Sequence, residues 1–422
     1  MKLLQNRPFA LLWLAQIISG MGDVLYTVGV MVTIFASTES ALQTVGVTIA
    51  AALPPFVLGP IAGSLVDRYS RRWVLVVMDV LRAGLVLALL VLIRTVGVEV
   101  WLIYAVVAGL AAASTFYLPA RQAIIPTLVP RHELVVANSL IFSTIQATMA
   151  LGFLVGGSLI LIWPLDLLLV VNGVAFMGAA VLTMLIRPHP QPIIETDLLK
   201  PQKEELPLWQ SIVGGWRYLR GHAIARPLIL MEMFEHIPHG IWTSGLMLVF
   251  ATQALGADTA AWGQQNAAYF GAQIAGAAMA ALFANWLARR AGWVIIANAF
   301  LSGVMTIAFA FSPTNLMAVI LAFSFGPPMA IRDVTQDSLL QMTVEEGQLG
   351  RVFAMRNMFR NIIFMVAGIF FAWLADYLFI RWIYAIGGVL YLLTALYAVS
   401  NRPLREAQMG KETAVVAQGA QA

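Results

Sequence analysis

The chain contains no cysteine and few charged residues. Of its 422 residues, 11% are charged and 60% are hydrophobic, whereas a soluble globular protein is about 25% charged and about 45–50% apolar. Without cysteine, the chain can have no disulfide framework, thiol nucleophile or cysteine-bound zinc. A surface with so little charge is suited to lipid rather than water, so the composition indicates a membrane protein.

Sequence motifs for ATP binding and for hydrolytic catalysis are missing as well. There is no Gly-x-x-x-x-Gly-Lys-Ser/Thr loop for ATP, and no Ser/His/Asp arrangement suggests hydrolysis. The net charge of +4 is modest, and no basic run alternates with aromatic residues, so nucleic acid is not an expected partner. We therefore expect no enzymatic activity, no cofactor and no bound metal. An ion gradient would have to drive any uphill transport.

Long apolar segments follow one another along the chain, each with roughly the 20 residues that a membrane-crossing helix needs. They predict an all-α membrane protein with twelve transmembrane helices in two six-helix halves. The segment from Phe9 to Phe35 is too long for a signal peptide and is expected to remain as the first span. The predicted spans are 9–36, 43–66, 73–94, 100–120, 138–162 and 166–186, followed by 227–252, 262–287, 292–312, 314–331, 353–375 and 381–400.

A proline-rich polar stretch separates the two sets of spans. Within it, apolar residues at helical spacing between Leu208 and Leu219 predict an amphipathic helix, lying either on the membrane surface or against neighbouring loops. The predicted organisation is an N-terminal six-helix half at 1–187, a cytoplasmic linker with this helix at 188–225, a C-terminal six-helix half at 226–401 and a disordered cytoplasmic tail at 402–422.

Lysine and arginine are unevenly distributed among the predicted loops. With the N-terminus in the cytoplasm, 22 of the 25 basic residues lie on the cytoplasmic side, Arg94 and Arg381 lie outside, and Arg82 lies within a span. Cytoplasmic loops of membrane proteins carry such an excess. We therefore expect a multi-pass protein of the bacterial inner membrane with both termini in the cytoplasm.

The polar loop after the second predicted span carries five residues at a defined spacing: Gly63, Asp67, Arg68, Arg71 and Arg72. The loop resembles the signature loop of the major facilitator superfamily, Gly-x-x-x-Asp-Arg-x-x-Arg-Arg, with Ser70 in place of the usual glycine. The resemblance implies the major facilitator fold and a conformational latch, in which the acid and the arginines form contacts in one conformation and break them in the other. Alternatively, the arginines only set the topology.

Further segments narrow the resemblance. Asn6-Arg-Pro-Phe9, Pro119-Ala-Arg-Gln122 and Gly350-Arg-Val-Phe353 are similar to the multidrug-efflux and enterobactin-exporter branch. Antiporters of the superfamily usually carry Gly-x-x-x-Gly-Pro-x-x-Gly-Gly on the fifth span. The aligned residues here lack the first glycine and the proline: Thr148, Gly152, Phe153, Gly156 and Gly157.

Ionisable residues inside spans are costly, so each is a candidate functional residue. Asp23 lies near the middle of the first span, where a carboxyl group can exchange protons or, alternatively, hydrogen-bond at a helix break near Gly20 and Gly22. Asp79 and Arg82 are three residues apart on the third span and can form an intramembrane ion pair. We favour a structural role for that pair.

The seventh span has an unusual polar face made by Glu232, Glu235, His236 and His239. Their spacings of three and four residues place them on one side of a helix, which Pro238 should kink. Four such residues favour a cavity-facing site for protons or a cationic substrate. A divalent metal site and a simple helix-packing contact are the weaker alternatives.

These observations predict a monomeric secondary active transporter in the lipid bilayer. We expect proton-coupled export of a small amphiphilic compound by alternating access, with Asp23 and the polar face of the seventh span as coupling and substrate residues. A dedicated siderophore or metabolite exporter is the alternative within transport, and a non-transporting sensor or assembly partner is the alternative outside it.

Overall fold

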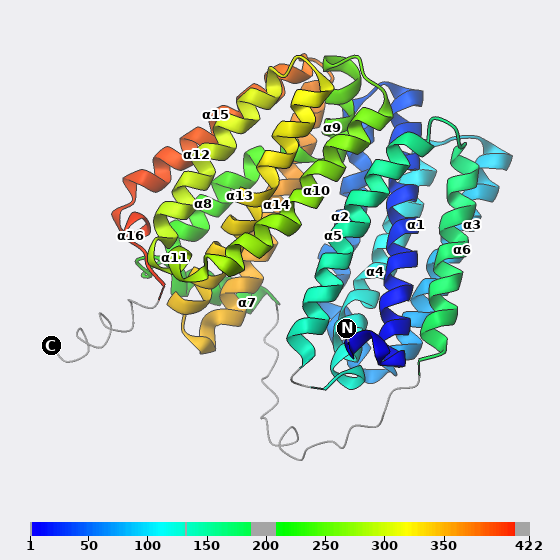
Figure 1. Cartoon of the computed structure of the whole chain (residues 1–422), viewed down its shortest axis with the longest axis horizontal. Helices are drawn as coiled ribbons and strands as arrows, with labels where there is room; N and C mark the ends of the chain where they lie inside the picture. The colour runs from blue at the N-terminus through cyan, green and yellow to red at the C-terminus, as the bar shows by residue number, and fades with distance from the viewer. Residues whose placement is uncertain (1, 131–132, 187–207, 410–422) are drawn as a thin grey trace. The chain divides into compact units, whose positions relative to one another are not determined.

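The computed structural model describes residues 2–130, 133–186 and 208–409, and all regular secondary structure in these ranges is helical (Figure 1). Contacts within the chain divide it into two compact units. The first unit comprises Met1–Glu39 and Gly46–Leu206, and the second comprises Ser40–Val45 and Pro207–Ala422.

Six long helices make up the N-terminal part of the chain, preceded by the short 3₁₀ helix η1 (Lys2–Gln5). They are α1 (Arg7–Thr38), α2 (Ala41–Arg68), α3 (Arg71–Val96), α4 (Val100–Leu128), α5 (Leu134–Leu159) and α6 (Leu165–Met184). Within the first unit, α1 packs against α5 and α6, and α3 packs against α4 and α6.

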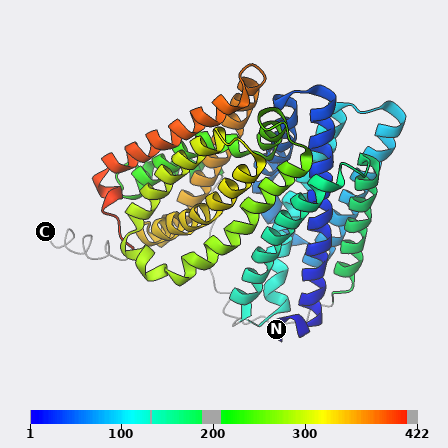
Figure 2. The same cartoon turned by 45° about the horizontal axis from the view of Figure 1, so that its top comes forward.

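The C-terminal part begins with α7 and contains a more interrupted set of helices (Figures 1 and 2). They are α7 (Leu208–Leu219), α8 (Ala225–His239), η4 (Gly240–Trp242), α9 (Ser244–Val249), η5 (Phe250–Ala254), α10 (Thr259–Leu282), α11 (Ala284–Arg289), α12 (Ala291–Ala310), α13 (Asn315–Thr343), α14 (Glu346–Ala375), α15 (Ile380–Ser400) and α16 (Arg402–Arg405). Its tightest pairs are α10 with α13 and α12 with α15.

Ten helices in the described ranges are long and apolar enough to cross a membrane: α1 to α6 and α12 to α15. The predicted seventh crossing is divided into shorter helices, and α10 corresponds to the eighth. The arrangement agrees with an all-α membrane protein in which one predicted crossing of the second unit is divided into short helices.

Glycines let α5 approach α1 closely. A Cβ atom at Gly152 would lie 2.7 Å from Cβ of Val24, and one at Gly156 would lie 3.2 Å from a methyl carbon of Leu25. Real Cβ atoms almost never approach other carbons as closely as 2.7 Å, so Gly152 is required by the contact. The aligned antiporter motif therefore keeps its close helix packing although it lacks the proline.

Gly152→Ala is expected to lower the melting temperature of the purified protein, because the added methyl group must displace α1, and overpacking costs about 1–3 kcal/mol. Gly178→Ala is the matched control, since a Cβ atom added to Gly178 on α6 would meet nothing within 4 Å. There, alanine should be neutral or stabilising because it favours the helix. Equal effects of the two substitutions would contradict the close contact.

The seventh crossing is broken after Pro238. Proline cannot donate a backbone hydrogen bond, and α8 gives way at Gly240 to the 3₁₀ helix η4. The next segment, α9, is capped at its N-terminus by Thr243, whose hydroxyl accepts a hydrogen bond from the backbone N–H of Leu246 at 3.4 Å. Trp242 stacks on Phe325 with ring centroids 4.6 Å apart, and this aromatic contact anchors the break inside the second unit.

Two regions near the predicted linker and tail can be compared with the structure. The helix expected between Leu208 and Leu219 is present as α7, and it packs against α14, with Gly215 seated on the backbone of Arg351. The rest of the linker up to residue 207 lies outside the described residues. The tail was expected to be disordered from residue 402.

Instead, the first part of the tail packs on α12. The backbone N–H of Gly292 donates to the carbonyl oxygen of Ala407 at 3.1 Å. The backbone N–H of Met409 donates to the carbonyl oxygen of Ala288 at 2.8 Å. Leu404 is fully buried. The apolar contact of Leu404 and these backbone hydrogen bonds explain why residues 402–409 differ from the prediction, which now applies only to 410–422, outside the described residues.

Candidate functional site

A cavity of about 290 Å³ lies inside the first unit, with both polar and apolar side chains in its lining. Four helices line it, because α1, α3, α4 and α5 each turn a polar face inward within an otherwise apolar bundle. The lining residues are Gln16, Ser19, Gly20, Asp23, Arg82, Ser114, Tyr117, Leu118, Arg121, Thr144, Ile145, Thr148 and Met149. Asp23, predicted from the sequence as a functional residue, therefore faces a cavity rather than lipid.

The predicted pair Asp79 and Arg82 lies next to this cavity. Arg82 Nη1 is 3.5 Å from Asp79 Oδ1, and both side chains are almost completely buried. Arg82 also places its guanidinium carbon 4.0 Å from the ring centroid of Tyr117, which adds a cation–π contact. Among the residues that the structure describes, none donates a hydrogen bond to either carboxylate oxygen of Asp79.

Arg82 also interacts with a second acid. Asp23 lines the same cavity as Arg82, whose guanidinium pairs with Asp79, so two carboxyl groups lie within the electrostatic range of one guanidinium. A buried carboxylate without a full set of donors is unfavourable. A proton, or a positively charged group of a substrate, can therefore neutralise part of the negative charge of these carboxylates.

A hydrogen-bond chain extends this site along α4. Arg121 Nη1 donates to Gln16 Oε1 at 2.8 Å, and Gln16 Nε2 donates to the hydroxyl of Tyr117. The predicted fourth span ended at residue 120, directly before Arg121. In the structure α4 continues to Leu128, so Arg121 lies inside the helix. The polar Gln16 on the first apolar span was the signal that could have revealed the chain.

The second unit contains a larger set of charges around α8. We call it the α8 cluster and define it as Glu232, Glu235, His236, His239, Arg332, Asp333, Gln336, Asp337, Arg356 and Arg360. Its members come from α8, α13 and α14. The four polar residues predicted on the seventh span all belong to it, whereas the six from α13 and α14 were not predicted as site residues.

Glu232 is held by Arg356. The guanidinium makes a bidentate contact, with Nη2 2.8 Å from Glu232 Oε1 and Nε bonded to Oε2, while Nη1 contacts Asp337. Glu232 and Arg356 are both buried, whereas the Asp337 side chain is 48% exposed. Two parallel N–H···O bonds make this the strong kind of ion pair.

Glu235 forms an ion pair with Arg332 of α13 through a single contact. Arg332 Nη1 lies 2.9 Å from Glu235 Oε1, and its Nη2 lies 2.7 Å from Asp333 Oδ1. Gln336 Nε2 donates to the other oxygen of Glu235 at 3.2 Å. Arg332 and Arg356 thus each join a buried glutamate of α8 to a half-exposed aspartate of α13.

The geometry fixes the tautomer of His236. Arg360 Nε can only donate, and it lies 3.0 Å from His236 Nε2, which must therefore accept. The proton of the neutral ring is then on Nδ1, which donates to the carbonyl oxygen of Glu232 at 2.7 Å. In this arrangement His236 is uncharged. His239 lies beside it, with ring centroids 5.7 Å apart and Nδ1 3.3 Å from the hydroxyl of Tyr391.

The charges of the α8 cluster do not balance. Its ionised members are four carboxylates and three guanidiniums, and its imidazole at His236 is neutral. One negative charge remains when all carboxyl groups are ionised and His239 is neutral as well. The half-exposed aspartates of α13 are the accessible carboxylates of the cluster. In the part of the chain that is described, no three His, Asp or Glu side chains are arranged so that they could hold a metal ion.

The predicted latch loop is only partly described. The side chains of Gly63, Asp67 and Arg68 lie outside the described residues. Arg71 Nη1 donates to the carbonyl of Ala123 at 3.2 Å, and Arg72 Nη1 donates to that of Ile186 at 2.9 Å. The two arginines thus connect the start of α3 to α4 and to the end of α6 within the first unit.

The predicted partnership of Asp23 with the seventh span stays a prediction. Asp23 belongs to the first unit and the α8 cluster to the second. Each unit instead supplies its own partners: Asp23 has Arg82 nearby, and the glutamates of α8 have Arg332 and Arg356.

The chain belongs to the Major Facilitator Superfamily, whose family model matches residues 12–326. It is 24% identical over 410 residues to the MFS-type transporter YjbB of Bacillus subtilis (strain 168), covering 95% of this chain and 97% of that protein. It is 20% identical over 403 residues to macrolide efflux protein A of Streptococcus pyogenes, covering 94% and 96%. The crystal structure of the nucleoside transporter NupG is similar in fold, with a TM-score of 0.66 and 12% identity over 95% of this chain and 99% of that one.

The family, the relatives and the fold agree with one another. The protein is a multi-pass membrane transporter with the major facilitator fold, and it is not an enzyme.

Proposed function

We propose that this transporter exports a small amphiphilic compound in exchange for protons, by alternating access, from the cytoplasm across the bacterial inner membrane. The observation that carries the proposal is the cavity inside the bundle, which Asp23 and Arg82 both line and beside which Arg82 pairs with Asp79. A proton held on Asp23 or Asp79 can be exchanged for a substrate that occupies this cavity.

The chemistry of the cavity supports an amphiphilic substrate. Leu118, Ile145 and Met149 supply apolar lining, while Asp23 and Arg121 supply charge. A relative of similar length is named as a macrolide efflux protein, which supports export and the multidrug-efflux branch. The excess of basic residues in the predicted cytoplasmic loops supports an orientation with both termini inside.

Transport in everted membrane vesicles tests the function. Ethidium and a radiolabelled macrolide serve as probes, in a host that lacks its own efflux pumps. A pH gradient, acid inside the vesicle, should drive accumulation of at least one probe, and nigericin, which collapses the gradient, should release it. Accumulation that survives nigericin would overturn proton coupling. A panel in which no amphiphilic compound accumulates would overturn the substrate class.

We also propose that Gly63, Asp67, Arg68, Arg71 and Arg72 form the conformational latch. The contacts of Arg71 and Arg72 with backbone carbonyls support a role beyond topology, because they join the loop to α4 and α6. Asp67→Asn is expected to slow probe transport several-fold at near-normal membrane abundance, since it shifts the conformational equilibrium without unfolding the bundle. An unchanged rate in the vesicle assay would remove the latch role.

A further inference from the structure

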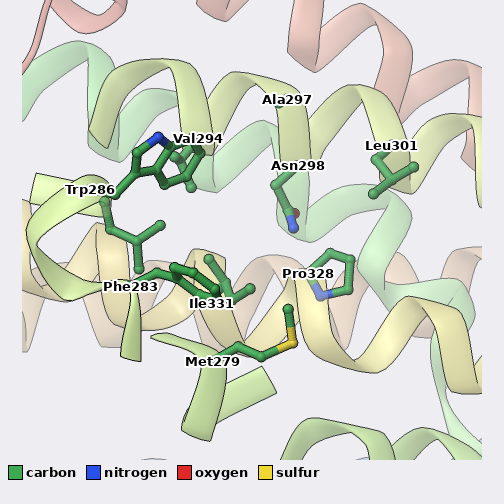
Figure 3. A pocket seen from close by; sticks show the side chains of 10 residues that line it. Met279, Phe283, Trp286, Val294, Ala297, Asn298, Leu301, Pro328 and Ile331 are labelled. Atoms are coloured by element: carbon green, nitrogen blue, oxygen red, sulfur yellow. The ribbon is translucent and has the colours of Figure 1, made fainter. Parts of the chain in front are cut away.

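An apolar groove of about 570 Å³ opens on the second unit, apart from the α8 cluster. It lies between α10, α11, α12 and α13, and Figure 3 shows side chains of these helices around it. Ten residues line it: Met279, Phe283, Trp286, Leu287, Val294, Ala297, Asn298, Leu301, Pro328 and Ile331. Its one polar member, Asn298, is buried and accepts a hydrogen bond from Ser302.

The groove has an apolar wall formed by α12. Val294, Ala297 and Leu301 lie at spacings of three and four on one face of α12. From Val294 to Leu301 the helix rises about 10 Å, roughly a third of the ~30 Å hydrocarbon core. Met279, Phe283 and Trp286 are each about half exposed, at 41%, 54% and 51%. This shape suits a hydrocarbon chain that lies along α12.

Positive charge is placed at one end of the groove. Arg289 and Arg290 are exposed at the junction of α11 and α12, directly before the helix that forms the wall. The guanidinium carbon of Arg290 lies 5.8 Å from the ring centroid of Trp286, so the charge sits beside the groove lining. Tryptophan and arginine are typical of the level of lipid headgroups.

We propose that this groove binds one anionic phospholipid, with an acyl chain along α12 toward Leu301 and the phosphate at Arg289 and Arg290. The occupant is a lipid rather than a protein helix because the groove combines an apolar lining with two exposed arginines at a single end. Under the proposed orientation, the lipid belongs to the cytoplasmic leaflet. The site is independent of the coupling residues and of the substrate.

Native mass spectrometry of the full-length protein in detergent tests the site. Phosphatidylglycerol is expected to remain bound at lower concentration than phosphatidylcholine with the same acyl chains. Arg289→Gln with Arg290→Gln should weaken phosphatidylglycerol retention by about fivefold for each arginine. Arg217→Gln removes an exposed positive charge from α7, away from the groove, and should leave retention unchanged.

Substitutions that fill the groove distinguish lipid binding inside it from lipid attraction to surface charge alone. Ala297→Trp should reduce the binding of both lipids, whereas Val304→Trp, on the same helix beyond the groove, should not. Loss with the arginine variant but not with Ala297→Trp would mean that only surface charge attracts the lipid, and it would overturn the groove. Equal retention of the two lipids would overturn the headgroup assignment.

If Ala297→Trp does not fold, quenching of tryptophan fluorescence by brominated lipid tests the position of the lipid instead. A minor fraction of phosphatidylglycerol with brominated acyl chains, in phosphatidylcholine vesicles, should quench wild-type tryptophan emission more than brominated phosphatidylcholine does at the same fraction. Trp286→Phe should remove this difference, and Trp382→Phe, an exposed tryptophan of α15, should retain it. A difference that persists in Trp286→Phe would place the lipid elsewhere and overturn the proposal.

Discussion

Asp23→Asn is expected to reduce gradient-driven accumulation of a transported probe to the level of vesicles without the protein, while probe exchange down its own gradient continues. Asparagine preserves the size and polarity of Asp23 in the cavity but cannot carry a proton. Exchange without a gradient requires only the cavity and the conformational change. Uphill movement requires that a proton be exchanged for the substrate, so only this activity depends on the carboxyl group.

The measurement compares accumulation driven by a pH gradient with counterflow in vesicles of matched protein content. Asp166→Asn is the control, since Asp166 forms an ion pair with Arg94 whose side chains are 25% and 71% exposed, and such pairs contribute little. This variant should behave like the wild type in both assays. If Asp23→Asn accumulates the probe at the wild-type rate with unchanged pH dependence, the proposed coupling role of Asp23 is wrong.

Glu232→Gln is expected to produce the largest loss of stability, about 3–5 kcal/mol, and a strong fall in membrane abundance. The substitution leaves Arg356 buried with only Asp337 to compensate its charge. Arg356→Gln should have a comparable effect because it leaves Glu232 ionised without its bidentate partner. The double variant should lose less than the sum of the two single losses, since neither charge is then left unpaired.

Thermal unfolding of detergent-purified protein and quantified membrane abundance provide the measurement. Arg402→Gln is the control, because Arg402 pairs with Glu406 at an exposed position where a pair contributes at most about 1 kcal/mol. Additive losses in the double variant would contradict direct coupling between Glu232 and Arg356. Glu232→Gln with wild-type stability would show that the charge on Glu232 is not needed to compensate Arg356.

Much of the fold followed from hydrophobic length alone. The first six predicted spans overlap α1 to α6, because a continuous apolar stretch in lipid has to satisfy its backbone by forming a helix. The local pattern also located the break of the seventh span, since proline interrupts a helix at a known point. Asp79 and Arg82 were recognisable as neighbours because the spacing on a single helix determines which side chains meet.

The partners of the α8 glutamates could not be predicted in this way. Arg332, Arg356 and Arg360 were counted only among the basic residues of the cytoplasmic side, and none was predicted as a partner of the seventh span. In the structure, Arg332 on α13 and both Arg356 and Arg360 on α14 contact α8. Which charges meet across three helices depends on tertiary packing, which hydropathy and spacing on one helix do not specify.

The interrupted seventh crossing has a mechanical consequence. The segment before Gly240 is fixed to α13 and α14 by two buried ion pairs, and the segment after it is anchored by the rings around Trp242. At the joint, a Cβ atom on Gly240 would lie 2.8 Å from the backbone nitrogen of Gly368, so the joint rests on α14. The two rigid helical segments can therefore change the angle between them through a few backbone dihedrals near Gly240, as at a hinge. Such bending would give faster amide hydrogen exchange at residues 240–243 than in the helical segments on either side. The buried ion pairs of α8 would stay intact while the helix bends.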